Sequence, residues 1–119
     1  ALFANVEKFF PVDADWIRGY VDTFLPSGYR PGMYHDPVNG NFNNAYCQAV
    51  AADSNVSQQL ILWSAEPETG TTKATEAPTF HPASPLCAAN IWGWQYGRDD
   101  ETCPIDTNLV DERLLQFLW

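Results

Sequence analysis

The chain alternates short apolar runs with longer segments of helical periodicity, and this alternation limits what it can fold into. The apolar runs are residues 2–7, 30–36, 60–66 and 90–96. Continuous apolar runs are typical of parallel strands, because such strands are covered on both faces. Strands that alternate with helices form βαβ units. The sequence therefore predicts an α/β fold with mostly parallel strands and flanking helices, in a single domain over residues 1–119.

Three helices are expected from caps and periodicity. Asp13 is placed to cap the first helix, whose apolar residues repeat at helical spacing. Asn41 is expected to cap the second helix, and Thr107 or Asn108 the last. The Thr- and Pro-rich stretch of about 67–89 shows no periodicity and is predicted to be a loop, of a length that is usually functional or mobile.

Carboxylates stand at or just beyond the ends of the predicted strands. Glu7, Asp36 and Glu66 end the first three apolar runs, and Asp106 follows the fourth. The carboxyl ends of parallel strands meet at one rim, where the reacting groups of such folds lie. Hydrolysis of a glycosidic bond needs two carboxyl groups roughly 5 to 9.5 Å apart, so a sugar-cleaving site is one interpretation. The alternative is that each carboxylate caps a helix or pairs with an arginine.

Aromatic side chains accompany these carboxylates. Tyr34, Trp92, Trp94 and Tyr96 offer flat faces on which sugar rings can stack. Alternate aromatics on a strand are also typical of a hydrophobic core. His35, which precedes Asp36, is either half of a catalytic pair or a structural histidine.

The chain is acidic, with 6 basic and 15 acidic residues and a formal net charge of −9. Phosphate binding needs a basic stripe, so this composition argues against nucleic acid and anionic membrane surfaces as partners. There is no run of about 18 apolar residues, so no membrane span is expected. Neither CxxC nor HxxxH spacing occurs, and no metal or cofactor is expected. Polysaccharides fit this charge well.

The three cysteines are Cys47, Cys87 and Cys103, an odd number that leaves one over. Cys87 and Cys103 flank the fourth apolar run. A disulfide between them would stabilise the fold by roughly 3 kcal/mol in the chain-entropy model. The alternative is three reduced cysteines that pack as small apolar side chains.

Three segments together resemble one known group of proteins. Residues 3–7 (FANVE) are similar to the Asp-x-Glu strand of glycoside hydrolase family 25 lysozymes and of the related glycoside hydrolase-like domain of bacterial surface proteins. Residues 30–34 (RPGMY) resemble the following strand of these proteins, a Gly-x-Tyr segment. WQY at 94–96, followed by IDTN at 105–108, resembles their closing motif. The order matches across nearly the whole chain.

The resemblance implies the C-terminal half of a TIM-like (β/α) barrel and cleavage of the β-1,4 bonds of peptidoglycan. Glu7 would be the general acid, with a pKa raised by an apolar site so that it holds a proton near neutral pH. Asp106 would shape the charge around the sugar. The other matched residues would line the groove or orient its neighbours: Tyr34, Trp94, Gln95 and Asn108. A secreted or cell-surface protein follows from the same resemblance.

Two features depart from this group. Asn5 stands where the motif has aspartate, so the second carboxylate would come from Asp36 or Asp106, or activity would be lost. A complete barrel takes about 250 residues, and Ala1 reads as the middle of a strand, so a preceding half is expected. Four strands cannot close, which predicts self-association or pairing with that half. The alternative function is a non-catalytic carbohydrate-binding module or a self-assembling surface module.

Overall fold

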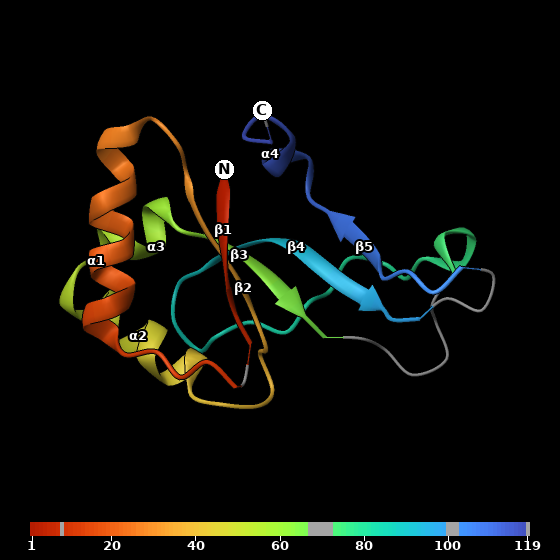
Figure 1. Cartoon of the computed structure of the whole chain (residues 1–119), viewed down its shortest axis with the longest axis horizontal. Helices are drawn as coiled ribbons and strands as arrows, with labels where there is room; N and C mark the ends of the chain where they lie inside the picture. Colours follow the sequence, from red (N-terminus) through yellow and green to blue (C-terminus); the bar gives the residue numbers. More distant parts are fainter. Residues whose placement is uncertain (8, 67–72, 100–102, 119) are drawn as a thin grey trace.

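The computed structural model of the chain describes residues 1–7, 9–66, 73–99 and 103–118. Within these ranges a single sheet has α1 and α2 packed against one face (Figure 1). The strands are β1 (Leu2–Val6), β2 (Pro31–His35), β3 (Ile61–Ala65), β4 (Asn90–Gly97) and β5 (Thr107–Val110). The α-helices are α1 (Ala14–Phe24), α2 (Phe42–Ala52), α3 (Asn55–Gln59) and α4 (Glu112–Leu115). Two 3-10 turns are η1 (Leu25–Ser27) and η2 (Ala74–Glu76).

The first four strands are parallel and lie side by side in sequence order. This confirms the predicted α/β architecture with a mostly parallel sheet. β5 pairs with β4 in the antiparallel sense, so the prediction of a helix capped by Thr107 or Asn108 is wrong. These residues give β4 a partner along an edge that would otherwise expose unpaired backbone groups. The last helix, α4, begins after Asp111, whose Oδ1 accepts a hydrogen bond of 2.9 Å from the Arg113 N–H.

The two long helices start close to each other. α1 begins where predicted, because Oδ1 of Asp13 accepts a hydrogen bond of 2.8 Å from the Trp16 N–H. Asn41 precedes α2 but makes no side-chain cap to it. Its side chain instead accepts from the Val12 N–H (3.4 Å) and donates to the Val12 carbonyl (2.6 Å), which joins the starts of the two helices. Among the described residues, no helix has both the length and the apolarity needed to cross a membrane.

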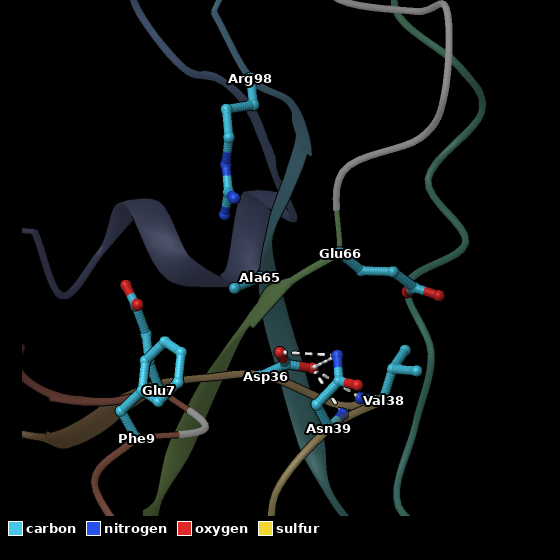
Figure 2. A pocket seen from close by; sticks show the side chains of 8 residues that line it. All are labelled: Glu7, Phe9, Asp36, Val38, Asn39, Ala65, Glu66 and Arg98. Atoms are coloured by element: carbon cyan, nitrogen blue, oxygen red, sulfur yellow. Dashed lines mark hydrogen bonds between the residues drawn. The ribbon is translucent and has the colours of Figure 1, made fainter.

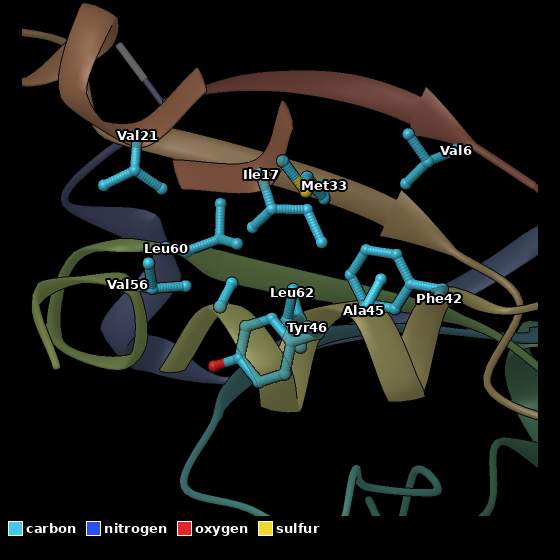
Figure 3. Packing of buried hydrophobic residues seen from close by; sticks show 11 residues of the cluster. Val6, Ile17, Val21, Met33, Phe42, Ala45, Tyr46, Val56, Leu60 and Leu62 are labelled. Atoms are coloured by element: carbon cyan, nitrogen blue, oxygen red, sulfur yellow. The ribbon is translucent and has the colours of Figure 1, made fainter. Parts of the chain in front are cut away.

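The main hydrophobic core lies between the sheet and these helices (Figure 3). Strands contribute their alternate side chains to it, as expected for period-two geometry. The helices contribute residues spaced three or four apart. The strand residues of the core are Val6, Met33 and Leu62, and the residues from the helices and the end of α3 are Ile17, Val21, Phe42, Ala45, Tyr46, Ala49, Val56 and Leu60.

The opposite face of the sheet, called the open face below, presents Phe3, Tyr34, Trp63 and Gln95. At one end of this face α4 and Phe117 pack over the buried ring of Trp92. Towards the carboxyl ends of the strands the face borders two hollows. The open face is therefore the side on which ligand-sized space exists beside the sheet.

The predicted loop of about 67–89 begins with residues 67–72, which lie outside the described residues. Its described part runs over the helix-side face of β4, where η2 is its one regular element. Phe80 and His81 meet the ring of Trp94 edge-to-face, at centroid distances of 6.2 and 4.6 Å. The Tyr96 hydroxyl donates to the Lys73 carbonyl at 3.2 Å. This segment thus covers β4 on the side where α1 and α2 cover the earlier strands.

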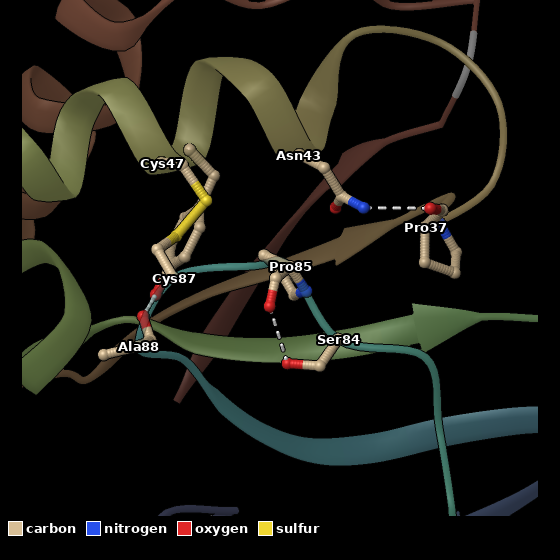
Figure 4. Close-up of a disulfide and its surroundings, with 8 residues drawn as sticks. Pro37, Asn43, Cys47, Ser84, Pro85, Cys87 and Ala88 are labelled. Carbon is tan, nitrogen blue, oxygen red and sulfur yellow. Dashed lines mark hydrogen bonds between the residues drawn. A yellow bond between two sulfur atoms is a disulfide. The ribbon is translucent and has the colours of Figure 1, made fainter.

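A disulfide joins Cys47 of α2 to Cys87, with the two Cα atoms 5.6 Å apart (Figure 4). The predicted bond between Cys87 and Cys103 is wrong, and Cys103 is a free, exposed thiol. The eight residues of β4 separate those two positions, and an extended strand of that length spans roughly 25 Å. A disulfide needs Cα atoms within about 7 Å. The observed bond is reinforced by the Tyr46 hydroxyl, which donates to the Ala88 carbonyl at 2.9 Å.

Candidate functional site

Three of the predicted carboxylates meet at the carboxyl ends of the parallel strands. Glu7, Asp36 and Glu66 border one hollow of about 390 Å³ (Figure 2). Each follows the last residue of its strand, so the in-register parallel pairing of β1, β2 and β3 brings them to the same rim. The rest of the lining is Phe9, Val38, Asn39, Ala65 and Arg98.

Asp36 is held by the turn that follows β2. Its Oδ1 accepts hydrogen bonds from the backbone N–H groups of Val38 (2.9 Å) and Asn39 (2.8 Å). The Asn39 side-chain amide donates to Oδ2 at 3.1 Å. These bonds are typical of an aspartate that stabilises a tight turn. Asp36 therefore shapes the rim, and its oxygens already serve local donors.

Glu66 turns away from the centre of the hollow, towards the segment that covers β4 (Figure 2). Its Oε2 accepts a hydrogen bond of 2.7 Å from the Ala83 N–H. Its backbone carbonyl accepts another, of 3.0 Å, from Nε1 of Trp94. Both bonds join the end of β3 to neighbouring segments, so Glu66 has a structural role.

Glu7 extends into the hollow, and Arg98 extends into it from the opposite side (Figure 2). The Glu7 carboxylate makes no hydrogen bond to another residue in the part of the chain that the structure describes. Its backbone N–H donates to Oδ1 of Asn5 at 3.3 Å. Of the three rim carboxylates, Glu7 is the one whose oxygens are presented to the hollow.

Tyr34 connects Glu7 with Asp106. Burial raises the pKa of the Tyr34 phenol most, and the negative charges of Glu7 and Asp106 raise it further, while Arg98 acts in the opposite direction. Both carboxylates therefore lie within electrostatic range of one hydroxyl group. The phenol donates a hydrogen bond to Oε1 of Gln95. Tyr34 borders the same hollow as Asp106, and Glu7 borders the other hollow.

A second hollow of about 350 Å³ adjoins Tyr34 on the open face. Asp106 and Asn108, from the segment before β5 and from β5 itself, lie at its border. Asn108 accepts a hydrogen bond of 3.0 Å at Oδ1 from Nε1 of Trp63. The lining is Phe3, Tyr34, Trp63, Gln95, Asp106 and Asn108. Within the two hollows, aromatic rings and carboxylates thus lie close to each other.

The predicted aromatic row on β4 is divided between different surroundings. The rings of Trp94 and Tyr96 are each 1% exposed and lie under the segment that covers the helix-side face, away from the hollow that Tyr34 and Gln95 line. Trp92 is 9% exposed and stacks on Phe117, with the Arg30 and Arg113 guanidinium groups 5.9 and 5.4 Å from its ring centroid. The structure does not bring these three rings to either hollow.

His35 lies on the helix-side face, fully buried against Phe42 at a ring-centroid distance of 4.4 Å. Burial lowers its pKa from 6.5 to about 4. It is therefore a structural histidine and not a partner of Asp36 in catalysis. Among the described residues, no group of His, Cys, Asp or Glu side chains is placed to hold a metal ion.

Sequence reasoning missed two residues that border the hollows, Trp63 and Arg98. Trp63 sits in the continuous apolar run of β3, which gives no sign of the face to which each side chain belongs. Alternation of side chains along β3 could have assigned Trp63 to the open face, because Trp63 pairs in register with Tyr34 of β2. Arg98 follows β4 directly, at the same rim as the carboxylates.

Comparison with known proteins gives one informative match. No model of a protein family matches the chain, and no curated protein matches it. The chain is similar to a solved crystal structure of an uncharacterized protein from B. stearothermophilus, with 58% identity over 99% of this chain and a TM-score of 0.94. It covers 55% of the length of that protein. The match shows that the same fold forms part of a longer chain.

Proposed function

We propose that this chain is a glycoside hydrolase-like domain that binds a polysaccharide at the two hollows and cleaves a glycosidic bond there. The observation that carries the proposal is the convergence of Glu7, Asp36 and Glu66 at one hollow, close to a second hollow that Tyr34, Trp63 and Asp106 line. Glycoside hydrolysis requires two carboxyl groups that flank the scissile bond, and carboxylates border both hollows.

In this proposal Glu7 is the general acid, because its oxygens face the hollow. Glu7 donates its proton to the glycosidic oxygen as the bond from that oxygen to the anomeric carbon breaks. A water molecule supplies the oxygen that joins the anomeric carbon, and its proton passes to the carboxylate pair. Asp106 stabilises the positive charge that develops on the sugar ring. One bond is cleaved and one water molecule is consumed.

The class of substrate and the wider architecture come from the sequence resemblance. That resemblance favours peptidoglycan as the polysaccharide, a secreted or cell-surface protein, and the C-terminal half of a TIM-like barrel. The parallel order of β1 to β4, with rim carboxylates at their carboxyl ends, supports the barrel proposal. The 45% of the B. stearothermophilus protein that lies outside the match leaves room for a first half in a chain of that kind.

A second candidate function is a carbohydrate-binding module without catalysis. It is favoured by Asn5, an amide at the position where the lysozyme motif has aspartate. The commitment of Asp36 and Glu66 to backbone N–H groups favours it too, because neither is presented as a replacement carboxylate. In this case the hollows would bind the polysaccharide and leave it intact.

Release of reducing ends from purified peptidoglycan distinguishes the two functions. The decisive variant is Glu7→Gln, which keeps the shape of the side chain and removes its acidic proton. The matched control is Glu76→Gln, in the exposed turn η2 and away from both hollows. Hydrolysis is expected from the unmodified chain and from Glu76→Gln, and not from Glu7→Gln with an unchanged circular dichroism spectrum. Binding without release of reducing ends by the unmodified chain would establish the second function.

A further inference from the structure

We propose that Trp63 is the residue on which a sugar ring of the polysaccharide stacks. The inference deepens the proposed function, on which it rests, because it assigns a neutral pyranose unit to the hollow beside Tyr34. Neither the strand pattern nor the sequence resemblance assigns a role to Trp63.

The indole of Trp63 lies directly over the neighbouring strand, at a position where that strand has a glycine. Trp63 pairs in register with Gly93 of β4. A Cβ atom at Gly93 would come within 3.0 Å of Cγ, Cδ2 and Cε3 of the indole. Real Cβ atoms do not approach so closely, so the ring occupies the space that any other residue at position 93 would fill. Gly93 thereby allows the indole to approach the backbone of β4 closely.

Phe3 lies over another glycine of the sheet and braces Trp63 from the side. A Cβ atom at Gly32 of β2 would come within 3.0 Å of Cγ, Cδ1 and Cε1 of the Phe3 ring. The Phe3 and Trp63 rings meet edge-to-face, with centroids 5.5 Å apart and planes at 88°. Aromatic pairs in this geometry attract each other beyond the effect of burial. Two glycines and one ring contact therefore fix the platform from below and from the side.

The polar edge of the indole is also fixed. Nε1 of Trp63 donates its hydrogen to Oδ1 of Asn108 at 3.0 Å. This bond fixes the rotation of the ring and satisfies its only hydrogen-bond donor. Trp63 is only partly buried, whereas Trp92 and Trp94 are 9% and 1% exposed. Trp63 is thus the tryptophan of the sheet that retains an accessible surface within a hollow.

The surroundings of the indole fit a sugar better than a purely apolar ligand. A pyranose has an apolar face of C–H groups and a periphery of hydroxyl groups. Amide and carboxylate groups border the same hollow as the ring, and such groups can accept or donate hydrogen bonds to hydroxyls. Its volume of about 350 Å³ lies in the range of small-molecule sites. The polar members of the lining are Tyr34, Gln95, Asp106 and Asn108.

The test measures binding of a soluble tetramer of β-1,4-linked N-acetylglucosamine by isothermal titration calorimetry. Trp63→Phe and Gly93→Ala are the informative variants, since Gly93→Ala displaces the indole without altering Trp63 itself. Each is expected to weaken binding roughly tenfold. A thermal unfolding midpoint well above the assay temperature shows that a variant is folded in the binding experiment. The matched control is Trp16→Phe, an exposed tryptophan of α1 whose change should leave binding unaltered.

The outcomes separate this inference from the proposed function. Folded Trp63→Phe and Gly93→Ala proteins that bind the tetramer as tightly as the unmodified chain would overturn the role of Trp63, whatever Glu7→Gln does to hydrolysis. Weakened binding by the Trp63→Phe and Gly93→Ala proteins, together with loss of hydrolysis in Glu7→Gln, would support both the stacking role of Trp63 and the proposed function. Absence of any binding by the unmodified chain would refute the stacking role, and absence of hydrolysis alone would leave it standing on the binding data.

Discussion

The phenol of Tyr34 on β2 donates a hydrogen bond to Oε1 of Gln95 on β4, across the intervening strand β3. Gln95 is 2% exposed, so this amide oxygen depends on a protein donor. The bond holds Tyr34 and Gln95 together at the border of the hollow with Asp106. The same contact therefore supports the sheet and the arrangement of the candidate site.

Tyr34→Phe is expected to lower the free energy of unfolding by roughly 1–3 kcal/mol, because it leaves the Gln95 oxygen buried without a donor. Urea denaturation followed by circular dichroism measures the change. Tyr29→Phe serves as the control, since Tyr29 is 56% exposed and should give no comparable loss. Equal stability of the Tyr34→Phe and unmodified proteins would contradict this account of the bond.

Asn5→Asp is expected to raise the rate of glycosidic bond cleavage, because it adds a carboxylate close to Glu7 to the one that Asp106 provides. Asn5 pairs with Tyr34 in register, and an aspartate there can still accept the Glu7 N–H. Release of reducing ends from peptidoglycan is the measurement, with Asn44→Asp on the exposed side of α2 as the control. An unchanged rate in a folded Asn5→Asp protein would argue that the position does not take part in catalysis.

Reduction of the Cys47–Cys87 disulfide, or Cys47→Ser with Cys87→Ser, is expected to destabilise the fold. The bond closes a loop of sequence separation 40, for which the chain-entropy model gives roughly 4 kcal/mol. Thermal unfolding with and without reductant measures the effect. Cys103→Ser should leave the unfolding midpoint unchanged, because that thiol is exposed and unbonded. A reductant effect that persists in the double serine variant would point to another cause.

His35 should make the free energy of unfolding depend on pH. Burial lowers its pKa from 6.5 to about 4, so between these values the unfolded chain binds a proton that the folded chain does not. Stability from this residue is therefore complete above pH 6.5 and falls as the pH falls towards 4, by about 3 kcal/mol. Urea denaturation at several pH values between 7 and 4 measures the free energy of unfolding. This free energy should fall less with falling pH in His35→Leu than in His81→Gln. An identical fall in the two variants would refute this.

Association in solution should reflect the edge of the sheet at β1. β1 pairs with β2 along one side only, and such parallel edges are templates for pairing. Light scattering on the isolated chain is expected to show dimers or larger species, which should dissociate when a segment equivalent to the unmatched part of the B. stearothermophilus protein is added. A strict monomer at all concentrations would contradict the proposed half-barrel.

Local signals and simple topology predicted much of the fold. Asp13 caps α1 because an aspartate oxygen can satisfy the first free N–H groups of a helix, and that signal needs no tertiary knowledge. The convergence of Glu7, Asp36 and Glu66 follows from parallel pairing alone. Parallel pairing does not predict which of these carboxylates is available to a ligand. The N–H groups of Val38 and Ala83 are brought to Asp36 and Glu66 only by the folded loops.

The errors have physical causes as well. A strand covered on both faces is apolar throughout, so the sequence of β4 does not reveal that Trp94 and Gln95 point to opposite sides. The residues of β5 form a strand because β4 offers them an edge, and helical periodicity in so short a segment is weak evidence. The partner of Cys87 depends on α2 lying beside the segment before β4, a contact between residues 40 apart in sequence.

The bonds from Glu66 to Ala83 and from Cys47 to Cys87 hold an irregular segment over β4 where a helix would complete another βαβ unit. A helix in that place must keep its length and its apolar stripe. An irregular segment that is attached at separate points needs neither a fixed length nor an apolar stripe. Insertions and deletions between the attachment points would therefore leave the strands undisturbed. Divergence among proteins that share this fold should therefore concentrate there, and with it the shape of the wall beside the rim.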